Sequence, residues 1–331
     1  MQSTVAPGSG GTLLLTRSDV ERLLAPDECI AAVEDAFRRH ALGKAPPPGI
    51  LGMHAQEGSF HIKAALLTLG QPYFAAKANA NFPHNGARHG LPTIQGVVVL
   101  CDALNGLPLA VMDSMSITAL RTAAATAVAV KYLAREKCDT ALICGCGGQA
   151  AAQLRALLRV RRPARILAYD QNEERAGAFS GMIEKEFSIK ATSVTDLAQA
   201  VAVSDIVITC TTAQRYFISR KMVRPGTFVA GVGADNENKQ ELDPSLLEQC
   251  TLVTDLTEQC RAIGDLHHAP KARVHAELGE VIAGLKPGRT GDEEITVFDS
   301  SGTALQDVAA AIAVYQRALA SGEGTCFSFN A

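Results

Sequence analysis

Short apolar runs alternate with longer helix-like stretches through the second half of the chain, from residue 140 onward. The runs are typical of strands that are buried on both faces of a sheet, and the stretches between them are long enough for crossover helices. This order of elements predicts a doubly wound parallel sheet of the α/β class. The predicted strands are Thr140–Cys144, Arg165–Tyr169, Asp205–Thr209, Phe228–Gly231, Leu252–Thr254 and Thr296–Phe298.

The pattern between Ser59 and Ala110 is different, because its strand-like runs are separated by turns and not by helices. The turn Asp102–Gly106 contains Asn-Gly, which favours a hairpin between the two runs that flank it. We therefore expect an antiparallel α+β unit with a core of its own. Its predicted strands are Phe60–Ala64, Tyr73–Ala78, Thr93–Leu100 and Pro108–Met112.

Helix signals precede, join and follow these two regions. Pro26 with two acidic residues after it is typical of a helix start. Three prolines at positions 46–48 predict a rigid extended break. The predicted elements are a capped turn at Thr16–Val20 after a short strand, a helix from Pro26 to about Ala41, a bridging helix at Ile117–Ala134, and a final helix at Thr303–Ala320 that returns to the first domain.

The composition narrows the classes of protein and partner. The chain has 331 residues, of which 47% are apolar and 20% charged, and its formal net charge is −3. These values are ordinary for a globular protein of two domains, and the weak negative charge favours neither nucleic acid nor an anionic membrane as a partner. No apolar stretch reaches the roughly 18 residues that a membrane span needs.

Cysteine and histidine usage argues against disulfides and metal sites. The nine cysteines are odd in number and form no C-x-x-C pair, so we expect free thiols in a reducing cytoplasm. His267 and His268 are expected to point apart at the end of a surface helix, so no metal is predicted. Met1–Gly11 lacks the basic and apolar parts of a signal peptide, and we expect a disordered leader there.

The most specific motif is Gly145-Cys-Gly147-Gly148-Gln149-Ala150, at the carboxyl end of one predicted strand and the start of a helix. It has the G-x-G-x-x-G/A pattern that binds dinucleotides in this strand–turn–helix setting. Gly145 would make the tight turn, and Gly147 would let a pyrophosphate approach the backbone. Ala150 would let helix and strand pack closely. The alternative is a loop of some other α/β protein.

Asp170 ends the next predicted strand, 25 positions after Gly145. This is about the spacing of the carboxylate that accepts hydrogen bonds from the adenosine ribose. Because a carboxylate at this point also repels a 2′-phosphate, we predict NAD(H) as the preferred cofactor. Arg175, one turn further on, leaves NADP(H) open as the alternative.

Five further stretches follow one another along the chain: Lys77-Ala-Asn-Ala-Asn-Phe-Pro-His-Asn85, Gly90-Leu-Pro-Thr-Ile-Gln95, Ile117-Thr-Ala-Leu-Arg121-Thr122-Ala-Ala-Ala-Thr126, Gly233-Ala-Asp235-Asn-Glu-Asn-Lys-Gln-Glu241-Leu and Phe298-Asp-Ser-Ser301-Gly-Thr-Ala-Leu-Gln-Asp307. In this order they resemble the ornithine cyclodeaminase/μ-crystallin family, from about Leu13 to Ala318. That family includes ornithine and lysine cyclodeaminases, alanine dehydrogenase, and reductases of cyclic ketimines or iminosuccinate.

The resemblance implies a role for each of several residues. Lys77 would lie against the reacting end of an amino- or imino-acid substrate, and Arg121 would clamp its carboxylate. Asp235 would be the acid/base for the substrate nitrogen. Thr122 matches the family motif for contacts with the cofactor. Ser301 follows the last predicted strand and is expected to line the nicotinamide site.

The residues taken alone leave simpler roles open. Lys77 could be an exposed edge lysine, Arg121 could pair with Asp113, and Asp235 could be a turn residue. Thr122 could hydrogen-bond only within its own helix. The sequence does not decide whether burial or a nearby cation dominates the pKa of Asp235.

One departure from the family pattern concerns substrate binding. Many relatives carry an arginine near the Pro-Pro segment as a second carboxylate clamp, and here positions 46–50 read Pro-Pro-Pro-Gly-Ile. Lys63 lies where relatives often have Met-Pro, and we expect it to replace that arginine. Ornithine cyclodeaminase places a glutamate near this segment for the δ-amine, whereas His61 or a neighbour lies there in this chain. The ornithine-specific contact is therefore not evident.

Together these features predict two domains: residues 1–127 with 308–331 for substrate binding and dimerisation, and residues 128–307 as a Rossmann-type dinucleotide-binding domain. The predicted function is NAD(H)-dependent reduction of a small cyclic or linear α-imino acid, such as Δ1-pyrroline-2-carboxylate, or the reverse oxidation. The alternatives are an ornithine cyclodeaminase, which forms proline and releases ammonia, and a non-catalytic NAD(P)H-binding protein like μ-crystallin. By resemblance, the first domain is expected to form a homodimer.

Overall fold

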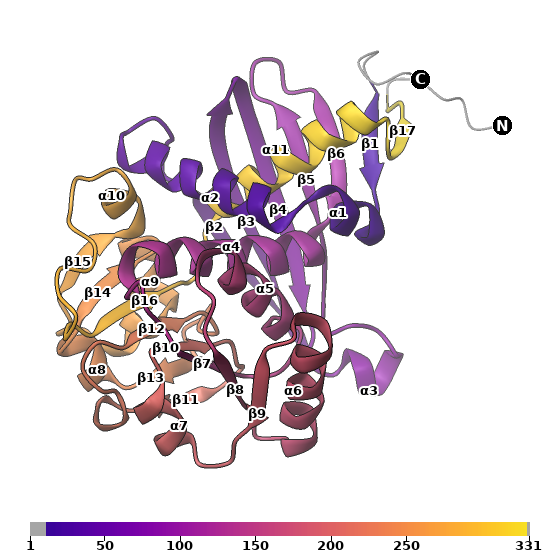
Figure 1. The fold of residues 1–331 in the computed structure, drawn as a ribbon. Helices are drawn as coiled ribbons and strands as arrows, with labels where there is room; N and C mark the ends of the chain where they lie inside the picture. The colour runs from indigo at the N-terminus through magenta and orange to yellow at the C-terminus, as the bar shows by residue number, and fades with distance from the viewer. Residues whose placement is uncertain (1–10, 330–331) are drawn as a thin grey trace. The chain divides into compact units, whose positions relative to one another are not determined.

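The computed structural model describes residues 11–329, which form two compact units (Figure 1). Unit 1 contains the described residues up to Arg121 and those from Thr303 onward, and unit 2 is Thr122–Gly302. The sequence-based boundaries lie five or six residues later along the chain, so packing assigns residues 303–307 to unit 1. Residues 1–10, most of the segment expected to be a disordered leader, lie outside the described residues.

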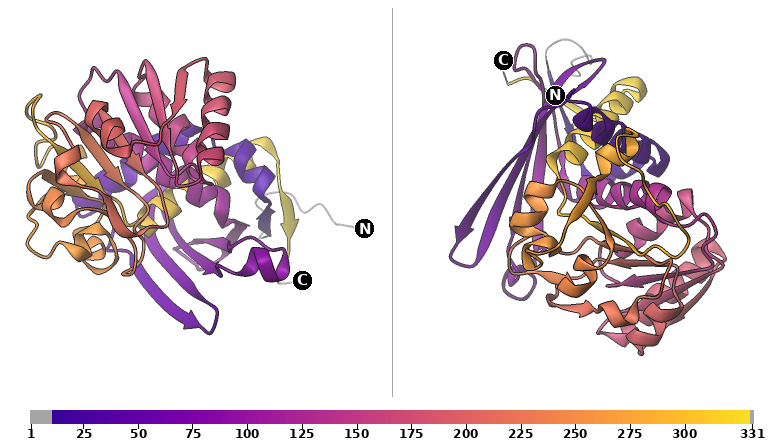
Figure 2. Two further views of the ribbon diagram at one scale, coloured as in Figure 1. Left: turned by 90° about the horizontal axis from the view of Figure 1, so that it is seen from below. Right: turned by 90° about the vertical axis from the view of Figure 1, so that its left-hand side faces the viewer.

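Unit 1 is built on a seven-stranded sheet in the order β17-β1-β6-β5-β4-β3-β2. Its strands pair antiparallel, as predicted, except that β1 runs parallel to β6. Figure 2 shows β2, β3 and β4 as a long twisted ribbon in indigo and purple. The strands are β1 (Thr12–Leu15), β2 (Gly49–Ala55), β3 (Gly58–Leu69), β4 (Gln71–Asn81), β5 (Ile94–Asp102), β6 (Pro108–Asp113) and β17 (Thr325–Phe327).

Helices pack on this sheet and begin where the sequence signals them. The Thr16 side chain caps α1 reciprocally with Asp19, and Pro26 is the first residue of α2. Helix α11 packs on α2 and on strands β3 and β4. The helices of unit 1 are α1 (Arg17–Leu23), α2 (Pro26–Ala41), α3 (Asn85–His89) and α11 (Ala304–Ser321); α4 (Ser114–Leu133) begins in unit 1 and continues in unit 2.

Unit 2 confirms the predicted doubly wound fold. Its main sheet has eight strands, all parallel, in the order β15-β14-β16-β12-β10-β7-β8-β9, and the direction of winding reverses between β7 and β10. The strands are β7 (Thr140–Cys144), β8 (Arg165–Tyr169), β9 (Lys190–Ser193), β10 (Ile206–Thr209), β12 (Phe228–Gly231), β14 (Thr251–Thr254), β15 (Val274–Glu277) and β16 (Thr296–Asp299).

The connections of unit 2 are mostly short helices. They are α5 (Ala150–Val160), α6 (Glu173–Phe187), α7 (Leu197–Val203), α8 (Pro244–Glu248), α9 (Thr257–Ile263) and α10 (Leu278–Ile282), with 3-10 turns η1 (Arg220–Met222) and η2 (Asp265–His268) and a small sheet of β11 (Gln214–Ile218) and β13 (Gln240–Leu242). None of the helices within residues 11–329 is long and apolar enough to cross a membrane.

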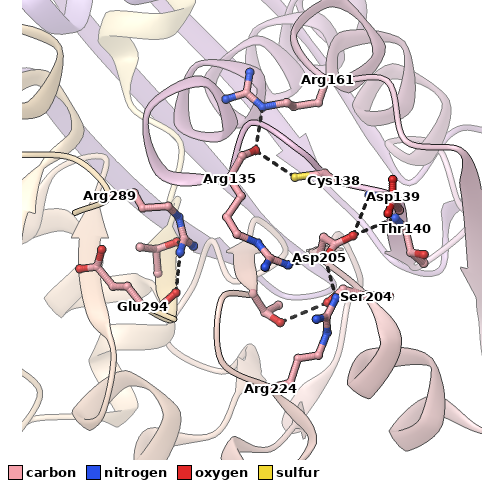
Figure 3. Close-up of polar contacts among 12 residues, drawn as sticks. Arg135, Cys138, Asp139, Thr140, Arg161, Ser204, Asp205, Arg224, Arg289 and Glu294 are labelled. Carbon is pink, nitrogen blue, oxygen red and sulfur yellow. Dashed lines mark hydrogen bonds and ion pairs between the residues drawn. The ribbon is translucent and has the colours of Figure 1, made fainter. Parts of the chain in front are cut away.

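A polar cluster around Asp205 closes the amino edge of the unit 2 sheet (Figure 3). The Asp205 carboxylate accepts the N–H groups of Asp139 at 2.7 Å and Thr140 at 3.0 Å, and it pairs with Arg135 and Arg224. Burial alone would raise the pKa of Asp205, but these N–H donors and guanidinium charges outweigh it and hold the pKa below its usual value. The charged carboxylate therefore ties together the strands at this edge.

Two further arginines of Figure 3 cap the carboxyl end of α4. Arg289 donates to the carbonyl of Leu133 at 2.7 Å, and Arg161 donates to the carbonyl of Lys131 at 3.3 Å and to that of Arg135, just after the helix, at 3.0 Å. The last carbonyls of a helix have no partner within the helix, so these cations satisfy them and oppose the negative end of its dipole. The end of α4 is thus fixed to the same edge of the sheet.

We predict that Asp205→Asn lowers the free energy of unfolding by about 3 kcal/mol at pH 7, because two guanidinium groups lose their buried counter-charge. Since the folded-state pKa lies below the unfolded one, this contribution is present above about pH 4 and is lost as the pH falls further. Urea unfolding of both proteins between pH 3 and 7 measures the difference. If the difference in free energy of unfolding between the two proteins does not become smaller at low pH, this role of the carboxylate is contradicted.

Candidate active site

The turn after β7 has the geometry that its glycines predict. Gly145 has φ of 93°, and a Cβ added there would come within 2.8 Å of the Cys210 carbonyl oxygen, so the position requires glycine. At Gly147 and Gly148 an added Cβ would meet nothing within 4 Å. The backbone at these two glycines is therefore open to a ligand.

Helix α5 begins directly after this turn. Ala150 is its first residue and is fully buried, as close packing of helix and strand requires. Gln149 occupies the N-cap position without a side-chain capping bond, and its buried Oε1 has no hydrogen-bond partner among the described residues. Uncapped N–H groups at a helix start suit an anion such as a pyrophosphate.

Asp170 lies beside the glycine turn. It follows β8, and its Oδ2 accepts the N–H of Cys146 at 2.8 Å while its Oδ1 accepts the N–H of Asn172 at 2.9 Å. The Nη1 atom of Arg175 is 3.6 Å from Oδ1, and the Arg175 side chain is 56% exposed. The structure therefore brings together the glycine turn, the helix start and the acid that the sequence identified.

Unit 1 holds a buried set of charged residues that we call the ion cluster: Lys77 on β4, Arg121 on α4 and Asp307 on α11. The Lys77 Nζ donates to Asp307 Oδ1 at 2.8 Å, and the Arg121 Nε lies 2.8 Å from the same oxygen. All three residues are at most 5% exposed. Lys63 on β3 is 8% exposed and is paired directly with Lys77 in the β3–β4 register.

These contacts exclude two of the simpler roles. Lys77 is no exposed edge lysine, because β4 lies between β3 and β5 and the residue is 3% exposed. Arg121 does not pair with Asp113, which instead lies 3.5 Å from Arg17. Both cations therefore point into the interior of unit 1.

The charges of the ion cluster are strongly coupled. Burial lowers the pKa of Lys77 to about 7, the charge of Arg121 lowers it as well, and Asp307 opposes both effects. Burial would raise the pKa of Asp307, but Arg121 and Lys77 outweigh it and hold that pKa below its usual value. Among the described residues of unit 1, Lys63, Lys77 and Arg121 are the buried bases and Asp307 is the buried acid. An arrangement with more bases than acids favours an anionic ligand such as a carboxylate.

Asp235 is exposed. It follows β12 at the carboxyl edge of the unit 2 sheet, its side chain is 54% exposed, and its Oδ1 accepts a hydrogen bond from Lys239 Nζ at 2.6 Å. The side chain of Asp235 is therefore not buried, and the cation beside it, Lys239, comes from its own loop. Sequence reasoning missed Lys239, although its spacing of four residues from Asp235 is a signal for such a pair.

Buried carboxylates to which the sequence analysis gave no role hold the loops at this edge. Glu241 accepts the N–H of Gly233, two residues before Asp235, at 2.7 Å. Asp255 accepts the N–H of Gly302 at 2.7 Å. Burial raises the pKa of Glu241, and burial together with neighbouring acids raises that of Asp299 to about 7. An acid at the end of a buried apolar strand, as at positions 255 and 299, could have revealed this group.

The remaining predicted residues have the following places. Thr122 is 7% exposed on α4, and its carbonyl accepts a hydrogen bond from the Thr126 hydroxyl at 3.2 Å. The Ser301 hydroxyl donates to Asp255 at 3.0 Å and is buried. The expectation that His267 and His268 point apart is wrong, because their ring centroids lie 5.0 Å apart in edge contact. Within residues 11–329, no group of three or more His, Cys, Asp or Glu side chains could hold a metal ion.

Comparison with known proteins gives consistent matches over nearly the whole chain. Residues 11–322 match the model of the ornithine cyclodeaminase/mu-crystallin family. The alanine dehydrogenase of Archaeoglobus fulgidus is 40% identical over 324 residues, which cover 96% of this chain and 98% of that protein.

Solved structures match the fold equally closely. An archaeal alanine dehydrogenase dimer with bound NAD has a TM-score of 0.91 at 39% identity, covering 96% of this chain and 99% of that one. The Δ1-pyrroline-2-carboxylate reductase of Thermococcus litoralis, in complex with NADH and L-proline, has a TM-score of 0.89 at 35% identity, covering 95% and 99%. The iminosuccinate reductase of Paracoccus denitrificans, in complex with NAD+, has a TM-score of 0.88 at 30% identity, covering 96% and 99%.

Proposed function

The chain belongs to the ornithine cyclodeaminase/mu-crystallin family, and from this premise we propose that it is an NAD(H)-dependent oxidoreductase. Its proposed reaction is reduction of a small α-imino acid, such as Δ1-pyrroline-2-carboxylate, to the amino acid, or the reverse oxidation. The observation that carries the proposal is the ion cluster, in which Lys77 and Arg121 are buried around one oxygen of Asp307. Buried bases in excess of buried acids are costly to a fold unless an anion completes them.

The cofactor is proposed from the residues of unit 2. The open backbone at Gly147 and Gly148 and the start of α5 would hold the pyrophosphate, and Asp170 would accept hydrogen bonds from the ribose. Thr122 and Ser301 are proposed as further cofactor contacts. When bound, the nicotinamide would exchange a hydride with the α-carbon of the substrate. Asp170 favours NAD(H), because a 2′-phosphate would add negative charge beside its carboxylate.

The substrate side is proposed from the ion cluster. Arg121 would bind the substrate carboxylate, with Lys63 as a second clamp, and Lys77 would lie at the reacting end. Asp235 would hand a proton to the substrate nitrogen during reduction and take one during oxidation. Its place at the carboxyl edge of the sheet, after β12, supports this role, because open α/β sheets bind their ligands at that edge.

A specific observation favours an imino acid over ornithine. The buried acid of unit 1 among the described residues is Asp307, and it is already engaged with Lys77 and Arg121. No other buried carboxylate in that part of the chain is available for a second amine. A purely structural role, as in a crystallin-like protein, would not explain why desolvated bases are retained in place of apolar residues.

We propose a cytoplasmic location, because the cysteines are free thiols and a reducing cytoplasm keeps cysteines in that form.

We expect the purified protein to oxidise NADH in the presence of Δ1-pyrroline-2-carboxylate or a related imino acid. NADPH should be at least about tenfold less efficient, because of the charge at Asp170. The same assay is run with Δ1-piperideine-2-carboxylate, iminosuccinate, pyruvate with ammonia, and L-ornithine as substrates. Release of ammonia from ornithine without a net change in NADH absorbance would contradict the proposal in favour of a cyclodeaminase. NADH binding without turnover of any imino acid would favour a non-catalytic role.

We predict that Lys63→Met raises the KM for the imino acid about tenfold, since a buried charge-assisted contact to the carboxylate is lost. The KM for NADH should stay within about twofold, because the cofactor residues lie in unit 2. Lys44→Met, a change of an exposed lysine in the same unit, is the matched control. An unchanged KM for the imino acid in Lys63→Met would show that this lysine does not replace the missing arginine.

A homodimer through unit 1 is proposed from the exposed apolar side chains of β2. Leu51 is 54% exposed and Met53 is 55% exposed, on an edge strand that is exposed at every position. We predict sedimentation as a dimer of two 34.8 kDa chains and a monomer for the double variant Leu51→Glu, Met53→Glu. Leu104→Glu, on a turn at 74% exposure, is the control. A dimer that survives the double change would place the interface elsewhere.

A further inference from the structure

The first turn of α11 places two buried polar residues against the cations of unit 1. Gln306 is fully buried and its Oε1 accepts a hydrogen bond from Arg121 Nη1 at 2.6 Å. Asp307 is 2% exposed and its Oδ1 contacts both Lys77 Nζ and Arg121 Nε at 2.8 Å. Thr303 caps this helix start, where the helix dipole favours a carboxylate.

These contacts determine which N–H groups of Arg121 and Lys77 remain for a ligand. A guanidinium group only donates hydrogen bonds, so the amide oxygen of Gln306, and not its nitrogen, must face Arg121. With Nη1 held by Gln306 and Nε beside Asp307, Nη2 is the guanidinium nitrogen left for a ligand. Lys77 directs one N–H to Asp307 and another to the Thr118 hydroxyl at 3.3 Å, which leaves its third N–H.

We propose that Gln306 and Asp307 are positioning residues for the substrate carboxylate. Asp307 holds Lys77 and Arg121 on one oxygen, and Gln306 fixes the rotation of the guanidinium group, so that one donor of each cation is directed at the substrate. In this proposal both residues act through Arg121 and Lys77, which their side-chain oxygens contact. The inference rests on the proposed function, since it takes Lys77 and Arg121 as the carboxylate-binding cations.

The unpaired atoms of the two residues argue against a purely structural role. Asp307 Oδ2 and Gln306 Nε2 are buried and have no hydrogen-bond partner within the described residues. A polar cluster selected for stability would match such atoms or replace them by apolar groups. Buried polar atoms without partners are instead expected where geometry serves a ligand.

The charged groups that face Lys77 predict what removal of Asp307 does. Lys63 on β3 and Arg121 on α4 disfavour the protonated amine, and Asp307 on α11 is the acid that supports it. Without that acid, Lys77 loses its proton at a lower pH, and a carboxylate ligand loses one of its cations. The neutral residue Gln306 has no such effect, so the two variants differ in their dependence on pH.

The test measures the dissociation constant of cyclopentanecarboxylate, an anion of pyrroline size without a titratable nitrogen, on the NADH-bound protein by calorimetry. For Asp307→Asn, which keeps the shape and an oxygen acceptor, we expect binding about tenfold weaker than in the unaltered protein at pH 8 and a smaller difference at pH 6. For Gln306→Met, we expect a loss of similar size that is the same at both pH values. NADH affinity should stay unchanged in both variants.

Glu28→Gln is the matched control, because it breaks the ion pair between Glu28 of α2 and Arg317 of α11, away from the ion cluster. The inference is overturned if the loss in Asp307→Asn is the same at pH 6 and pH 8, or if NADH affinity falls in parallel. If Asp307→Asn does not fold, unchanged binding by Gln306→Met overturns it. Absence of any saturable carboxylate binding by the unaltered protein also overturns it. Carboxylate binding without turnover of any imino acid contradicts the proposed function alone and leaves the comparison of variants valid.

Discussion

Two buried cations share a single carboxylate oxygen in unit 1, and this contact sets the properties of the candidate substrate site. Lys77 and Arg121 come from a strand and a helix that are far apart in sequence, and Asp307 comes from a third element near the end of the chain. Desolvation of like charges opposes this arrangement, and Asp307 offsets only part of it. When Lys77 is protonated, this cluster of three residues has one more cation than it has acids, and a bound carboxylate would balance that charge.

At the carboxyl edge of the unit 2 sheet, buried carboxylates have a different role. Glu241 and Asp255 accept backbone N–H groups there, so they fix loops at the carboxyl edge of a parallel sheet. The loops of Asp235 and Ser301 are both anchored in this way. Reactive groups that lie on loops need such support, because loops alone do not hold a geometry.

The sequence predicted the elements whose pattern is local. Strands β7, β8 and β12 have the predicted bounds, because every position of β7 and β12 and the three central positions of β8 are buried, which favours a run of apolar residues. Strand β2 was not predicted, because it is exposed at every position and its sequence does not alternate between buried apolar and exposed polar residues. Asp307 was part of a quoted motif without a role, because its partner Lys77 is 230 positions away and burial cannot be read from one sequence. The exposure of Asp235 escaped prediction for the same reason.

The most direct measurement is the number of protons that the protein takes up when it binds cyclopentanecarboxylate at pH 7.5, from calorimetry in buffers of different ionisation enthalpy. Because burial and Arg121 lower the pKa of Lys77 to about 7 in the free protein, part of the population has a neutral amine at this pH. An anion beside the amine would favour its protonated form, so we expect net proton uptake on binding. Binding without proton uptake would contradict a titrating lysine in the carboxylate site.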